Sequence, residues 1–162
     1  MRASSRSLYV AEPVAPAVIS TERIVMKPSA VEVTLLPDGR WADIAPAHVR
    51  EVLTRSFANT ERFSLVTRGT TGPIPDYTLM IDIESFEARR PAAGTPPAEA
   101  VVAMTLSILR NADGRLIASR RFARTAGAAQ TDALTVVSAF ERANSALLQE
   151  AVAWAVPIMT GR

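Results

Sequence analysis

The sequence contains no cysteine and only one histidine, His48. Without cysteine there can be no disulfide, no thiolate nucleophile and no cysteine-ligated metal site. A histidine-based triad or metal site would have to use His48 alone, and the spacing of the apolar residues around it places it near the start of a helix. We therefore expect His48 to be a surface or helix-end residue.

Lysine and aromatic residues are also scarce. Lys27 is the only lysine, so arginine supplies nearly all of the 18 basic residues, which face 16 acidic ones and leave a formal charge of +2. No basic run is longer than the pairs Arg89-Arg90 and Arg120-Arg121. A nucleic-acid-binding domain usually gathers its cations on one face, so nucleic acid is not an expected partner. Aromatic residues make up 6% of a chain that is 48% hydrophobic, which predicts a core of small aliphatic side chains.

Long hydrophobic runs are absent as well. The longest uninterrupted apolar stretch, residues 151–159, contains Pro157 and is far shorter than the roughly 20 residues needed to span a bilayer. Residues 1–7 lack the apolar core of a signal peptide. We expect residues 1–6 to be a disordered lead-in, or a remnant left after a targeting segment is removed, and residues 7–159 to form a single domain.

Alternating apolar and polar residues predict the main strands of a sheet. Residues 77–86 alternate most clearly, with Leu79 and Ile81 on one face and Met80 and Asp82 on the other. Residues 98–110 alternate in the same way, and the turn sequence at residues 111–114 predicts that residues 115–122 return antiparallel to them. Shorter strands are expected at residues 8–10, 23–26, 31–36 and 63–67. The sequence Pro37-Asp38-Gly39 is typical of a turn, and residues 68–76, 89–97 and 125–130 are expected to be loops.

Two amphipathic helices are predicted. The first begins near Asp43 and Pro46 and ends at Asn59-Thr60. The second begins near Thr131-Asp132 and runs for about 26 residues, or roughly 39 Å. Its apolar stripe is expected to consist of Leu134, Val137, Phe140, Ala143, Leu147, Ala151, Trp154 and Ile158. Because an amphipathic sheet needs a cover on its apolar side, we expect an α+β fold in which an antiparallel sheet has two helices packed on one face.

A search for catalytic groups finds few candidates. Asp82 and Glu84 lie two residues apart on one strand face, so their carboxylates are neighbours that could serve acid–base or metal chemistry. The solvated face of an amphipathic strand explains them more simply, because no histidine or second acidic pair accompanies them. The sequence contains no phosphate-binding glycine loop, dinucleotide fingerprint or nucleophile elbow. We therefore expect no enzyme activity, no cofactor and no metal.

Four residues are candidates for binding a partner: Trp41, Asp82, Glu84 and Arg121. Adjacent residues on a strand point to opposite faces, so one of Arg120 and Arg121 must face the helix-covered side and find a carboxylate or carbonyl partner there. The other is free to meet an acidic partner or a lipid headgroup. Trp41 follows a predicted turn and could be either an interface anchor or part of the core.

Short landmarks spread along nearly the whole chain have the order and spacing of a known family. They are LYV at residues 8–10, RIV at 23–25, DGRWA at 38–42, HVREVL at 48–53, FSLV at 63–66, DYTL at 76–79, IESFEA at 83–88, GRLIASRRF at 114–122 and AFERA at 139–143. In these landmarks the sequence resembles the ABC-type transport auxiliary lipoproteins of Gram-negative bacteria.

The resemblance implies a periplasmic domain that a lipidated N-terminal cysteine tethers, usually to the outer membrane. Such proteins are accessories of transporters that combine an ABC permease and ATPase with a mammalian-cell-entry (MCE) domain protein and move lipids or other hydrophobic compounds. Because the sequence has no lipobox cysteine, we expect the signal peptide and that cysteine to precede Met1 in the natural chain. The family has no catalytic residues to carry over.

Two hypotheses of different kinds follow. In the first, the outer face of the sheet, including Thr78, Asp82 and Glu84, or its edges bind the MCE component or a second copy of the chain. This contact would hold the transporter beside the outer membrane. In the second, the domain is a carrier that holds an acyl chain between helix and sheet, which needs an apolar cavity of several hundred Å³. An envelope scaffold of similar fold is a third hypothesis.

Overall fold

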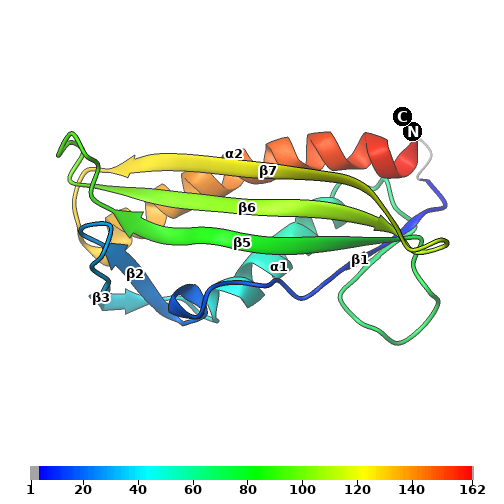
Figure 1. Ribbon diagram of the computed structural model, residues 1–162, viewed down its shortest axis with the longest axis horizontal. Coiled ribbons are helices and arrows are strands. Elements are labelled where there is room, and N and C mark those ends of the chain that lie inside the picture. The colour runs from blue at the N-terminus through cyan, green and yellow to red at the C-terminus, as the bar shows by residue number, and fades with distance from the viewer. Residues whose placement is uncertain (1–3, 162) are drawn as a thin grey trace.

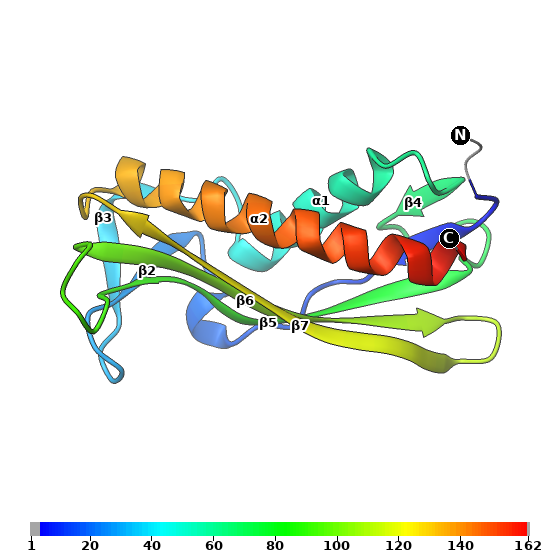
Figure 2. The ribbon, with the colours of Figure 1, turned by 90° about the horizontal axis from the view of Figure 1, so that it is seen from above.

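The computed structural model describes residues 4–161, in which a seven-stranded sheet is covered on one face by two α-helices (Figure 1, Figure 2). The α+β class and the position of both helices on the same face are as the sequence predicts. We call the opposite side of the sheet, which neither α-helix covers, the outer face.

Three long strands form one side of the sheet: β5 (Tyr77–Arg89), β6 (Ala98–Arg110) and β7 (Arg115–Ala128). They pair antiparallel in the order β5–β6–β7, which confirms the predicted hairpin. The prediction of a loop at residues 125–130 is wrong for residues 125–128, because these continue the ladder until Ala128 lies opposite Ala98. Their small side chains give no apolar alternation that would have identified them as strand.

Four short strands lie on the other side of β5. Two of them, β1 (Ser7–Val10) and β2 (Arg23–Lys27), pair with β5 in parallel, near its beginning and its end respectively. Strand β4 (Leu65–Thr67) pairs in parallel with β1, and β3 (Thr34–Arg40) pairs antiparallel with β2. The sheet is therefore mixed rather than wholly antiparallel. Parallel neighbours come from distant parts of the chain, and alternation within one strand does not reveal them.

Between β1 and β2 the chain continues to follow β5. The amides of Ala11 and Val14 donate to the carbonyl oxygens of Leu79 and Ile81 at 3.0 and 2.9 Å. A short 3-10 helix, η1 (Ala17–Ile19), then leaves this edge before β2 returns to it. Proline at positions 13 and 16 supplies no amide donor, so this stretch cannot form a regular ladder. Residues 7–27 thus line the length of β5.

The start of the chain is fixed next to the end of the first helix. Residues 1–3 of the expected lead-in lie outside the described residues. In the rest of it, Ser4 N donates to Arg62 O at 3.0 Å and Arg6 O accepts from Ser64 N at 2.9 Å. These bonds bring the chain into register for β1 to lie between β4 and β5.

The sequence Pro37-Asp38-Gly39 does not form the predicted turn but lies inside β3. Arg23 pairs with Arg40 and Val25 pairs with Leu35, so residues 36–39 bulge out opposite a single residue of β2. An edge strand tolerates this proline because its missing amide faces no neighbour. The bulge brings Asp38 to the second helix, where its Oδ2 accepts from Ala133 N at 3.1 Å and so caps the first turn.

The two helices are α1 (Ala45–Ala58) and α2 (Ala133–Thr160). Asp132 is the N-cap of α2, and its carboxylate accepts from Thr135 N at 3.1 Å; the C-cap Gly161 is left-handed, with φ 72°. The predicted stripe of α2 is confirmed in the middle of the helix, but Leu134 is 83% exposed. A step of three residues falls about 60° short of a full helical turn. The two such steps from Phe140 back to Leu134 therefore place Leu134 outside the buried side of the helix.

The core is the layer between the helices and the three long strands. Leu79, Met104 and Ile108 of the sheet and Leu147 of α2 are fully buried in it. Trp154 is partly buried and packs edge-on against Phe122 at 5.4 Å. None of the helices within residues 4–161 combines the length and apolar character that crossing a bilayer requires.

Candidate functional site

The outer face carries a mixed apolar and charged patch, which we call the outer-face patch. It consists of Val14, Met80, Asp82, Glu84, Thr105 and Arg121. Val14 is 69% exposed and Met80 39% exposed, although both are large apolar side chains. The bond from Ile83 N to Val14 O, at 2.8 Å, pairs Val14 with Asp82 and turns both side chains to the outer face. The sequence pattern placed Met80 on this face but gave no sign that Val14 joins it.

Glu84 and Arg121 form an ion pair at the centre of the patch. Arg121 Nε lies 2.7 Å from Glu84 Oε2, and Thr105 Oγ1 donates to Glu84 Oε1 at 3.4 Å. The β5–β6 register shifts between Ile83 and Ser85, which leaves Glu84 as the extra residue of a bulge. Asp82, also exposed, accepts no side-chain hydrogen bond from the described residues, so the patch keeps one carboxylate available for a partner.

Arg120 lies on the helix-covered side of β7, as the alternation predicted for one of the two adjacent arginines. Its Nη2 lies 2.8 Å from Glu150 Oε1 on α2, and its guanidinium stacks 5.0 Å from the centre of the Phe122 ring. Arg124 donates to the other oxygen of the same carboxylate. The predicted carboxylate partner is thus Glu150, and these arginines attach the edge strand to α2.

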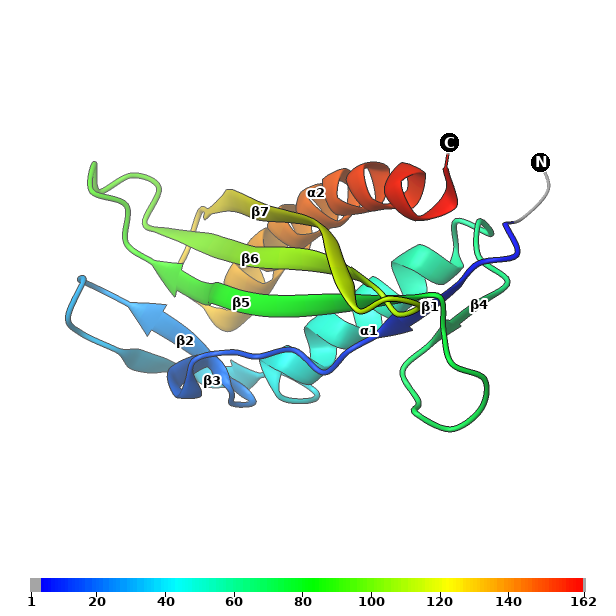
Figure 3. The same cartoon turned by 45° about the vertical axis from the view of Figure 1, so that its right-hand side comes forward.

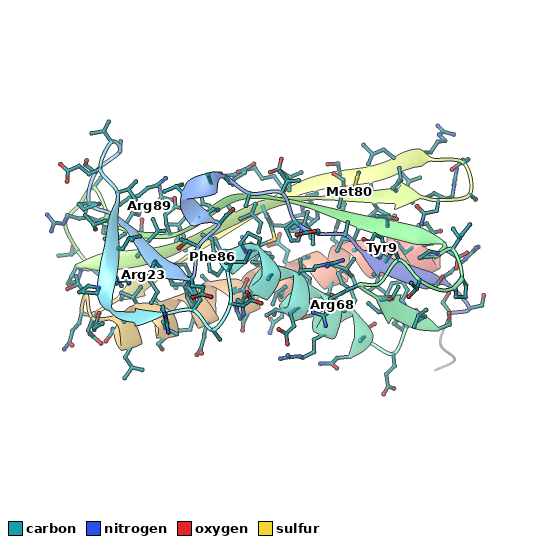
Figure 4. All side chains as sticks on the ribbon, turned by 90° about the horizontal axis from the view of Figure 1, so that it is seen from below. Tyr9, Arg23, Arg68, Met80, Phe86 and Arg89 are labelled. Carbon is teal, nitrogen blue, oxygen red and sulfur yellow. The ribbon has the colours of Figure 1, made fainter. Side chains whose placement is uncertain are left out.

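Trp41 does not belong to the outer-face patch. Its ring is stacked on His48 at 6.1 Å and packs against Phe86 at 5.4 Å and Phe140 at 5.1 Å. Figure 4 labels Phe86 beside the start of α1, well separated from Met80. The structure therefore separates Trp41 from Asp82, Glu84 and Arg121, and gives both its indole and the His48 ring a packing role where α1, β5 and α2 meet.

Two clefts have volumes in the range of small-ligand sites. One, of about 450 Å³, lies between the helices and is lined by Ser56, Ser145, Leu148, Gln149, Val152 and Ala153. The other, of about 440 Å³, lies where β2, β3 and the start of α2 meet and includes Met26, Pro37, Arg90 and Asp132. Neither lining contains a histidine. The second cleft is lined by the carboxylates of Asp38 and Asp132, and both of them accept from backbone amides in the first turn of α2. Among residues 4–161 no three His, Asp or Glu side chains are grouped closely enough to hold a metal ion.

The carboxyl groups with lowered pKa values lie at turns and caps, away from the outer-face patch. Asp76 accepts from Ser7 N at 2.8 Å, and this bond is the main cause that lowers the pKa of Asp76, with Arg6 adding to it. The side chain of Thr135 lowers the pKa of Asp132 in the same way. Arg110, bonded to Asp113 in the β6–β7 turn, lowers the pKa of Asp113 to about 2. In each case the lowered pKa reflects a hydrogen bond within a turn or cap.

Comparison with known proteins identifies relatives over most of the chain. A family model described as "ABC-type transport auxiliary lipoprotein component" matches residues 1–152. The uncharacterized protein bll6063 of Bradyrhizobium diazoefficiens is 28% identical over 153 residues, which make up 94% of this chain and 40% of that protein. The chain thus spans about two fifths of the length of this curated relative.

Solved structures share the fold. Protein XCC0632 from Xanthomonas campestris is 28% identical, with a TM-score of 0.85 over 96% of this chain and 86% of that one. The PelC dodecamer from Paraburkholderia phytofirmans, a variant in which one leucine is replaced by methionine, is 15% identical, with a TM-score of 0.56 over 99% of this chain and 92% of that one. At 15% identity the likeness to PelC concerns the fold alone.

Proposed function

Because the chain belongs to the ABC-type transport auxiliary lipoprotein component family, we propose that it is a non-enzymatic docking subunit of a transport system in the cell envelope. Its partners are an ABC permease and ATPase together with an MCE-domain protein, and the cargo is lipids or other hydrophobic compounds. A lipidated cysteine preceding the sequence tethers the domain from the periplasm to the outer membrane. The single observation that carries this proposal is the family match over residues 1–152.

The outer-face patch is the surface that we assign to the transporter. Non-obligate protein–protein interfaces combine apolar anchor residues with charged and polar groups. Val14 and Met80 supply the anchors, and Asp82 with the Glu84–Arg121 pair supplies the charges. The other face of the sheet is occupied by α1 and α2 (Figure 2). Trp41 supports this role indirectly, by packing α1 against β5 and α2.

A second copy of the chain is the alternative occupant of this patch. The protein PelC, which has the same fold, is known as a dodecamer. We favour the transporter because the family's description names a transport system rather than a self-assembly. Light scattering of the purified chain separates the two: a concentration-dependent rise in mass that Met80→Asp abolishes would assign the patch to self-association instead.

Co-purification of the natural, anchored protein with its transport system tests the proposal. The wild type is expected to retain the MCE protein encoded in the same operon, while Met80→Asp and Val14→Asp lose it because each places an uncompensated charge in the contact. Val31→Asp is the matched control, since Val31 is even more exposed, at 91%, but lies in the β2–β3 connection. Failure of the wild type to associate would contradict the proposal, and equal losses for Val31→Asp and Met80→Asp would contradict the assignment to the patch.

A lipid carrier is the second candidate, and the cleft between the helices is the observation that favours it. Its volume of about 450 Å³ suits part of an acyl chain, and Leu148 and Val152 contribute apolar lining. Native mass spectrometry of the purified chain would show a bound lipid, which Val152→Trp should displace by filling the cleft. A carrier is rejected if lipid binding is absent or unchanged by this substitution.

A further inference from the structure

Several segments distant in the sequence meet at one end of the molecule, which we call the terminal end. Figures 1 and 3 show the start of β1, the end of α2, the β4–β5 loop (residues 68–76) and the β6–β7 turn all on this side. Asn111 of the turn joins them: its Nδ2 donates to Pro75 O at 2.8 Å, and its backbone amide donates to Asp76 O at 2.9 Å. Asp76 in turn accepts from Ser7 of β1.

The terminal end presents large apolar side chains to solvent. Ile74 is 88% exposed near the end of the β4–β5 loop, and Leu116 is 55% exposed just after the β6–β7 turn. Ile74 stands between Pro73 and Pro75, whose rings fix the backbone and reduce the entropy lost when the side chain enters a contact. Asn111 braces both segments, so Ile74 and Leu116 are held on a supported surface rather than on free tails.

Cations accompany these apolar residues. Arg68 begins the β4–β5 loop and Arg115 begins β7, and both side chains are exposed. Within residues 4–161 neither guanidinium forms an ion pair or a side-chain hydrogen bond, whereas Arg6 and Arg110 nearby are paired with Asp76 and Asp113. Figure 4 shows Arg68 in the half of the molecule that holds Tyr9, opposite the half that holds Arg23 and Arg89.

We propose that the terminal end rests on an anionic lipid surface. Ile74 and Leu116 enter the headgroup region, and Arg68 and Arg115 pair with lipid phosphates. Exposed apolar side chains combined with cations are the elements of interfacial binding. The inference rests on the proposed function in one respect: a lipid anchor preceding residue 4 would hold this end, and not the β2–β3 end, at the membrane.

Vesicle flotation of the purified, unlipidated chain tests this contact. The wild type is expected to float with vesicles of phosphatidylethanolamine and phosphatidylglycerol, and more weakly with phosphatidylcholine alone. Ile74→Asp should weaken binding about tenfold by removing the apolar insertion. Each of Arg68→Glu and Arg115→Glu should weaken it at least about fivefold, an effect that added salt diminishes. Val31→Asp should bind as the wild type does, because the β2–β3 connection lies at the opposite end.

The inference is overturned if the wild type stays unbound, if Val31→Asp loses binding as much as Ile74→Asp, or if both vesicle types bind equally. Thermal unfolding of each variant checks that the loop substitutions leave the fold intact. Ile74→Asp is also expected to co-purify normally with the transporter, whereas Met80→Asp should bind vesicles normally. If the wild type co-purifies with the transporter but does not bind vesicles, this inference fails and the proposed function stands. If it binds vesicles but does not co-purify, the proposed function fails instead.

Discussion

A Cβ atom on Gly39 would lie 2.7 Å from the Cβ of Ala133, so β3 touches the first turn of α2 with no room for a side chain. The same approach brings Asp38 to the free amide of Ala133, at 3.1 Å. A segment that resembles a turn thus positions the long helix against the edge of the sheet, by one close contact and one cap.

Gly39→Ala should therefore destabilise the protein by about 1–3 kcal/mol, because the added methyl group pushes β3 and α2 apart in a packed region. Urea unfolding measures the loss. Gly69→Ala is the matched control, since a Cβ there meets nothing closer than 3.6 Å and the backbone is not left-handed. Equal stability of Gly39→Ala and wild type would mean that α2 does not depend on this contact.

Trp41 is a partner-binding candidate in the sequence that could equally belong to the core, and its packing favours the core. Trp41→Ala should lower the free energy of unfolding by about 2–3 kcal/mol, because it removes ring contacts with Phe86 and Phe140. Trp41→Phe should recover most of this stability. If Trp41→Ala left stability unchanged while abolishing co-purification with the transporter, Trp41 would be an interface anchor after all.

The lowered pKa of Asp76 predicts how the stability of the protein depends on pH. The pKa of Asp76 in the folded protein lies below its ordinary value of 3.8, chiefly because its carboxylate accepts from Ser7 N. A lowered folded-state pKa means that the carboxylate stabilises the fold fully above the unfolded-state pKa, and that this contribution disappears as the pH falls through the folded-state pKa. Asp76→Asn should thus cost about 1 kcal/mol at pH 7 and nothing at the lowest pH.

Unfolding followed across this pH range by circular dichroism provides the measurement for Asp76. Asp82→Asn serves as the control, because the Asp82 carboxylate is exposed and has no hydrogen-bond donor among the described side chains. A constant difference between Asp76→Asn and wild type from neutral to acid pH would show that the amide disturbs packing rather than removing the charge.

The parts of the fold that depend on local pattern could be predicted from the sequence. Strand β5 alternates strictly from Tyr77 to Ile83, and the turn at residues 111–114 places β7 beside β6. The two helices follow from their apolar spacing. Alternation along the strand also predicts that Arg120 and Arg121 point to opposite faces of the sheet. It could not identify Glu150 as the partner of Arg120, because the position of Glu150 depends on where α2 crosses β7.

The parts that depend on distant contacts could not be predicted. Pro37–Gly39 has turn residues, yet the contact with Ala133 keeps it in β3. Val14 looks like a loop residue between prolines, and only its bonds with β5 bring it beside Asp82. Ile74 has no alternating neighbours, and the bond to Pro75 O that fixes the end of its loop comes from Asn111, 36 residues further along the chain. In each case a residue far along the chain determines the local structure.

The parallel placement of β1 between β4 and β5 has a consequence for folding. Ser7 and its partner Asp76 are separated by 69 residues of the chain. Leu8 and Val10 are completely buried in the finished domain, and they pair there with Tyr77 and Leu79 of β5. Contacts so distant in sequence form late and leave apolar segments exposed to aggregation. Strand β1 therefore closes into the sheet only once a segment 69 residues further along the chain is in place.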